Sequence, residues 1–119
     1  MQLGPYLNLL NLAEADNIFL VKQQLSPEFN IQEDGSWEEW MNQLAVRINA
    51  MILSDFTGLV NLLYRLDVSE PRIRAALSDQ AGSDAGSLIA ALMVERQLEK
   101  IRTRELYRSA KDIPDDEKW

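Results

Sequence analysis

Two side chains on which much protein chemistry depends are missing from this chain of 119 residues, which has no cysteine and no histidine. Without cysteine there can be no disulfide and no thiolate metal ligand, so an apolar core has to hold the fold together. Without histidine the chain lacks the commonest general base and a common metal ligand. Most common catalytic mechanisms, which use histidine or cysteine, are therefore excluded for this chain. We expect no catalytic residue, no metal site and no cofactor.

Long apolar runs are missing too. Charged or amide residues interrupt every apolar run well short of the roughly 18 residues of a membrane span, and residues 1–6 carry no base of the kind that opens a secretory signal. We therefore expect a cytoplasmic protein without a membrane partner. The formal net charge of −7 opposes attraction to phosphate backbones, so we expect no nucleic-acid partner either.

The chain is instead rich in apolar residues at helical spacing. Its 46% apolar and 26% charged content is typical of one globular domain, which we place at residues 1–111. The spacing predicts helices over residues 5–25, 36–53, 56–67, 69–78 and 84–111. We predict an all-α fold, a compact bundle-like array of five or six helices with a long C-terminal helix. Residues 112–119 form an acidic tail, interrupted by proline, that we expect to be frayed.

The first helical segment has an expected end and two alternatives. Ser26-Pro27 predicts its end, because the residue before a proline is pushed out of the helical region. Asp16-Asn17 favours turns and could divide the segment in two, and residues 18–21 could form a short strand. We favour the helix.

Capping residues mark where later helices begin. Ser36 and Glu39, three residues apart, form a capping box in which each side chain satisfies a backbone donor near the other. Asp84 is the expected N-cap of the last helix.

Charge is unevenly distributed along the chain. Residues 85–111 hold six bases and three acids, whereas residues 1–84 hold twelve acids and five bases. The long helix is thus a basic rod attached to an acidic body. We favour the interpretation that the helix packs along this body; the alternative is a docking strip for an acidic partner.

The same helix carries two charged residues within its apolar pattern. Glu95 follows Ala91 by four residues, and Arg96 follows Leu92 by four, so we expect both charges at or near the core. Charge in such a place needs a partner. We predict that Arg65 pairs with Glu95, and Asp67 with Arg96, because a guanidinium group binds a carboxylate through two hydrogen bonds.

These pairs have a structural and a functional interpretation. In the first, they fix the angle between two helices, which is the commoner use of such clusters and the one we favour. In the second, Tyr64, Arg65, Glu95 and Arg96, with Asp67 beside them, line a polar pocket for a small anionic ligand. We assign none of these five residues a catalytic role.

One segment superficially resembles a calcium loop. The run Asn30-Ile31-Gln32-Glu33-Asp34-Gly35 offers oxygen ligands at the first three alternate positions and a glycine at the sixth. Position 12 is Met41, where a bidentate glutamate is required. We therefore interpret this segment as an ordinary loop.

Residues Leu62–Glu70, taken with Ile89–Gln97, resemble small helical bacterial proteins of uncharacterised function. The resemblance implies no activity, catalytic residue or cofactor. We therefore expect a non-enzymatic protein that acts through protein contact and self-associates, as a homodimer, through its final helix. The reason is that this helix has more apolar positions than one packing face needs. The alternative is a ligand binder or enzyme that uses the polar pocket.

Overall fold

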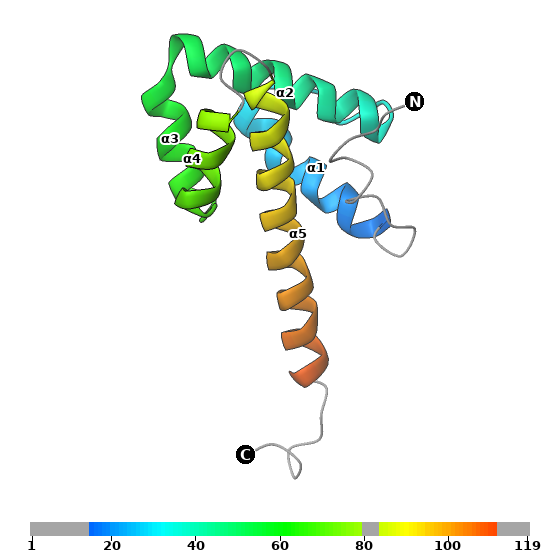
Figure 1. Ribbon diagram of the computed structural model, residues 1–119. Helices are drawn as coiled ribbons and strands as arrows, with labels where there is room; N and C mark the ends of the chain where they lie inside the picture. The colour runs from blue at the N-terminus through cyan, green and yellow to red at the C-terminus, as the bar shows by residue number, and fades with distance from the viewer. Residues whose placement is uncertain (1–14, 80–83, 112–119) are drawn as a thin grey trace.

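The computed structural model describes residues 15–79 and 84–111, and these residues are almost entirely helical. They form α1 (Ala15–Phe29), α2 (Trp37–Ser54), α3 (Phe56–Arg65), α4 (Glu70–Asp79) and α5 (Ala85–Lys111), without a strand among them. In Figure 1, α2 lies across the start of α5, while the far end of α5 projects away from the other helices. The predicted all-α fold with a long C-terminal helix is confirmed.

The core lies where α5 packs against α2, with α1 and α4 on its other sides. Both helices contribute large side chains that are fully buried: Trp40, Met41, Leu44 and Ile48 from α2, and Ile89, Met93 and Leu98 from α5. Each such burial stabilises the fold by roughly 1.5–3 kcal/mol. No helix in the described ranges is both long and apolar enough to cross a bilayer.

The end of α1 differs from the prediction. The helix continues through Pro27 to Phe29, so the predicted end at Ser26-Pro27 is wrong, as is a strand over residues 18–21. Proline removes one helical hydrogen bond, but the extra turn buries Phe29 in the core and Ser26 against Trp40, whose Nε1 donates to Ser26 Oγ at 2.9 Å. The burial of Phe29 and the bond to Ser26 outweigh the helical hydrogen bond that Pro27 removes. The predicted start of this helix at residue 5 lies outside the described residues, as do residues 80–83 and the predicted tail 112–119.

Two helices end in the same way. Asn30 after α1 and Asp67 after α3 have left-handed backbones, with φ of 54° and 61°. The amide of the following residue then donates five residues back, from Ile31 to the Ser26 carbonyl and from Val68 to the Leu63 carbonyl, each at 3.1 Å. This is a Schellman motif, and asparagine and aspartate tolerate its left-handed position better than most residues. The apolar residue that completes each motif is buried.

The predicted caps of α2 and α5 are confirmed. Ser36 N donates to Glu39 Oε1 at 2.8 Å and Glu39 N to Ser36 Oγ at 3.1 Å, which completes the capping box. Asp84 Oδ1 accepts from the amide of Ser87 at 3.1 Å. A second cap comes from another helix, because Asn49 of α2 accepts from Gly86 N at 2.9 Å.

Gly86 is the point of closest approach between α2 and α5. A Cβ added there would lie 2.5 Å from the Ala45 carbonyl oxygen and 2.6 Å from the Asn49 side chain. Both groups belong to α2, so a side chain at Gly86 would separate the two helices or displace the Asn49 cap.

We expect Gly86→Ala to lower the free energy of unfolding by about 1–3 kcal/mol, because it overpacks this contact. At an open helix position the same change stabilises by roughly 1 kcal/mol, so the sign of the effect is diagnostic. Urea unfolding followed by circular dichroism measures it. A variant more stable than the parent chain would contradict the close approach.

Candidate functional site

The C-terminal end of α3 is held by cations from α5. Arg96 Nη2 donates to Asp67 Oδ2 at 2.7 Å, and Arg96 Nε donates to the Asp67 carbonyl oxygen at 3.0 Å. Lys100 Nζ donates to the Leu66 carbonyl oxygen at 2.6 Å. The predicted Asp67–Arg96 pair is confirmed. Positive charge at the end of a helix also interacts favourably with its dipole, so Arg96 and Lys100 fix α3 on α5.

These contacts change the titration of their groups. The hydrogen bond from Arg96, followed by its charge, holds the pKa of Asp67 below its ordinary value of 3.8. Burial lowers the pKa of Lys100, as does the nearby charge of Arg96. Asp67 therefore keeps its negative charge to a lower pH in the folded protein than an ordinary aspartate does.

The predicted Arg65–Glu95 pair is wrong. Arg65 Nη1 and Nη2 donate to Glu28 of α1 at 3.3 and 3.4 Å. Arg72 of α4 donates to both carboxylate oxygens of Glu95, at 3.0 and 3.3 Å. The reason is that α4 packs along this part of α5 and brings its own arginine to Glu95.

Glu95 and Arg96 also lie further from the core than expected. Their side chains are 40% and 32% exposed, and they flank the buried stripe that contains Val94 and Leu98. The cost of burying these charges is therefore largely avoided, because both side chains reach water.

The predicted ligand residues are divided between several places. Tyr64 is exposed on the side of α3 that faces α4, and Arg65 pairs with α1. Only Asp67 and Arg96, from the predicted set, line a common polar hollow, which also includes Ser69, Arg72 and Glu99. Tyr64 and Arg96 thus line different hollows among the described residues, and a ligand site formed by Tyr64, Arg65, Glu95 and Arg96 stays a prediction.

The charges of this polar hollow are balanced. Arg96 bonds Asp67 and, at 3.1 Å, Glu99, while Arg72 bonds Glu95. An anion would have to compete with these carboxylates for both arginines. No group of three acidic side chains suited to a metal ion occurs within residues 15–79 and 84–111. Ligand binding at the hollow stays a prediction.

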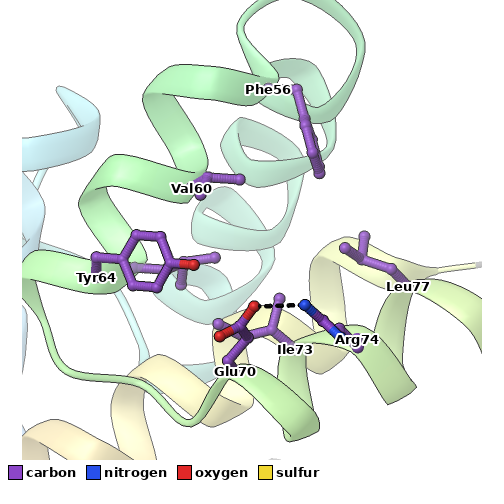
Figure 2. Close-up of a pocket in the computed structure, with 8 residues that line it drawn as sticks. Phe56, Val60, Tyr64, Glu70, Ile73, Arg74 and Leu77 are labelled. Atoms are coloured by element: carbon purple, nitrogen blue, oxygen red, sulfur yellow. Dashed lines mark hydrogen bonds and ion pairs between the residues drawn. The ribbon is translucent and has the colours of Figure 1, made fainter.

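A second, apolar hollow lies between α3 and α4, and we call it the α3–α4 groove (Figure 2). Phe56, Val60 and Tyr64 line it from α3, one per helical turn, and Ile73 and Leu77 line it from α4. On the α4 side of the groove, Arg74 donates to Glu70 at 2.7 Å. The groove has a volume of about 160 Å³. The spacing of Phe56, Val60 and Tyr64 is a sequence signal that our prediction did not use.

The last turns of α5 have no cover from the other described helices. Ile101 is the last buried residue of the helix, and residues 102–108, which we call the α5 end, are all exposed. Two of them are large and apolar: Leu106 is 72% and Tyr107 is 68% exposed. The α5 end thus presents apolar surface on a helix that projects from the body (Figure 1).

Comparisons of the chain with protein-family models, with curated proteins and with solved structures give no match. The described residues, with their contacts and exposure, are therefore the basis for any function assigned to it.

We expect Arg96→Gln to raise the pKa of Asp67 towards 3.8, because it removes the hydrogen bond and charge that lower it. A lowered folded pKa contributes stability that is present above the unfolded value and is lost as pH falls through the folded value. In Arg96→Gln, the part of the folding stability that comes from the lowered pKa of Asp67 should therefore be smaller. Carboxyl NMR titration of Asp67 measures the pKa, with Arg104→Gln as control. An unchanged titration curve in Arg96→Gln would contradict the assignment.

Replacing Glu95 should have a small effect. The Arg72–Glu95 pair is half exposed, and such pairs contribute about 0–1 kcal/mol, so we expect Glu95→Ala to lower the free energy of unfolding by less than about 1 kcal/mol. Leu98→Ala, three residues on and fully buried, should cost about 2–5 kcal/mol. Denaturant unfolding compares the two. Equal losses would show that Glu95 is part of the core.

Proposed function

We propose that this chain acts through protein contact, without chemistry of its own, and that it self-associates as a homodimer in the cytoplasm. The observation that carries the proposal is the exposure of Leu106 and Tyr107 on the α5 end, beyond the last buried residue of the helix. Two large apolar side chains exposed on a projecting helix offer apolar surface to another chain.

The support for self-association differs from the reason given by the sequence. The apolar positions that seemed in excess along α5 are used within one copy, where Ile89, Ala90, Met93 and Val94 are all buried. They leave no second apolar face in the first half of the helix. The α5 end is the part of this helix that remains available for another chain.

The size of the exposed surface indicates a weak contact. Burial of a large apolar side chain stabilises by roughly 1.5–3 kcal/mol, and association itself has a substantial cost in lost freedom. For two such side chains from each copy, we expect a dissociation constant on the order of 0.1–1 mM. Self-association should therefore be visible only in concentrated solution.

The alternative proposal is a small anionic ligand held at the polar hollow by Arg72 and Arg96. It is supported by the hollow itself and by the Ser69 hydroxyl at its edge. It has less support than protein contact, because carboxylates already pair with both arginines.

We expect the double change Leu106→Ser and Tyr107→Ser to weaken self-association at least tenfold without lowering thermal stability, because both side chains are exposed in one copy. Sedimentation velocity over a concentration series up to the millimolar range measures this. The matched control is Val46→Ser with Leu53→Ser, which removes two apolar side chains of similar exposure from α2. A strictly monomeric parent chain would rule out the self-association.

A further inference from the structure

The α5 end is basic as well as apolar. Residues 102–108 contain Arg102, Arg104 and Arg108 against a single acid, Glu105, and all seven residues are exposed. No ion pair to Arg104 or Arg108 is present among the residues that the structure describes. Within the described part of the chain, Arg104 and Arg108 therefore offer positive charge without an ion pair, on the same side of the helix as Tyr107.

An acidic surface lies at the corner between α1 and α2. Residues 28–39 contain five acids and no base, and all five acids are exposed. One base reaches them from α1, because Lys22 Nζ donates to the Gly35 carbonyl oxygen at 3.2 Å, and it leaves an excess of negative charge. Glu28 is paired with Arg65, and Glu39 belongs to the capping box. The other three acids, which have no ion pair within the described residues, lie in residues 33–38, which we call the acidic corner: Glu33, Asp34 and Glu38.

The acidic corner also carries an aromatic side chain. Trp37 lies among these acids, is only partly buried, and stacks on Trp40 with ring centroids 5.5 Å apart. The stacking against a fully buried tryptophan holds the Trp37 ring in place. The corner therefore combines negative charge with part of a rigid aromatic surface, as the α5 end combines positive charge with Tyr107.

These two surfaces lie at separate places on one copy. In Figure 1 the start of α2 is at one side of the body, while the end of α5 is at the tip of the projecting helix. The charges of one surface are therefore not neutralised by the other within the same chain. A second copy can provide the missing complement for each.

We propose that the α5 end of one copy docks on the acidic corner of a second copy, and that the second copy does the same in return. This inference rests on the proposed self-association and names the surface that receives α5. Arg104 and Arg108 approach Glu33, Asp34 and Glu38, while Tyr107, which lies on the same side of the helix as these two arginines, covers the exposed part of Trp37. The exchange forms two identical contacts related by a twofold axis, which closes the assembly at a dimer.

Charge favours this arrangement over contact between two α5 ends. Two copies of the α5 end would bring Arg104 and Arg108 of both chains together, and like charges at an interface disfavour that pairing. Docking on the acidic corner replaces this repulsion with attraction. The protein as a whole is acidic, so the basic end of α5 is the part of its surface best able to approach another copy.

The test uses charge reversal on each surface. One variant carries Arg104→Glu and Arg108→Glu, and the other carries Glu33→Lys and Asp34→Lys. Each alone places like charges at both contacts of a dimer, so we expect each to weaken self-association at least tenfold. An equimolar mixture pairs a reversed α5 end with a reversed corner and an unchanged end with an unchanged corner. We expect the mixture to form a heterodimer with close to the parent affinity, measured by sedimentation velocity with one variant labelled.

The control changes net charge by the same amount as the Arg104→Glu and Arg108→Glu variant, but elsewhere on the surface. Arg47→Glu with Arg74→Glu reverses two exposed bases on α2 and α4 and should leave self-association unchanged. Thermal melting checks that every variant is folded, and the neutral pairs Arg104→Gln with Arg108→Gln and Glu33→Gln with Asp34→Asn replace any that is not.

The outcomes separate this inference from the proposal on which it rests. If the parent chain dimerises and neither charge reversal weakens the dimer, the docking on the acidic corner is wrong and self-association stands. If both reversals weaken it but the mixture stays monomeric, the two surfaces do not contact each other and the inference is again wrong. A monomeric parent chain removes both.

Discussion

The packing of α5 on α2 sets the position of most of the groups that bear on function. It depends on a close approach at Gly86, where the backbone of α5 nearly touches the carbonyl of Ala45, and on Asn49, which reaches across to cap α5. Trp40 and its neighbours on α2 then meet the buried stripe of α5 along its first half. Because α2 covers only the first part of α5, the last turns of the long helix project beyond the body (Figure 1).

The charged residues in the middle of α5 follow from this arrangement. Once α5 is fixed, α4 lies along one edge of it and the end of α3 lies close to another. Glu95 accepts from Arg72 on the edge next to α4. On the edge next to α3, Arg96 donates to the carboxylate and the carbonyl oxygen of Asp67, and Lys100 donates to the carbonyl oxygen of Leu66. The charges that interrupt the apolar pattern thus join three helices, and nearly every one of them has an opposite charge or a carbonyl as its partner. A balanced cluster of this kind is better suited to holding helices than to binding a charged ligand.

The surfaces that lack such partners are found elsewhere. The α5 end has exposed apolar and basic side chains, the acidic corner has exposed carboxylates beside a stacked tryptophan, and the α3–α4 groove has an open apolar lining (Figure 2). The first two are complementary in charge and lie apart on one copy, which is the basis for assigning them to each other in a pair of copies. The groove has no comparable complement among the described residues.

Features that depend on a few neighbouring residues could be predicted from the sequence alone. Helical periodicity predicted the all-α fold, and the caps at Ser36, Glu39 and Asp84 were predicted correctly, because each acts on the backbone of its own turn. The Asp67–Arg96 pair was also predicted correctly, from the affinity of a guanidinium group for a carboxylate. Tertiary packing decided that α1 continues through Pro27, since the gain comes from burying Phe29 against other helices. It also decided that Glu95 binds Arg72 and that Tyr64 faces the α3–α4 groove, because these outcomes depend on which helix lies alongside, and helix packing is set by the whole core.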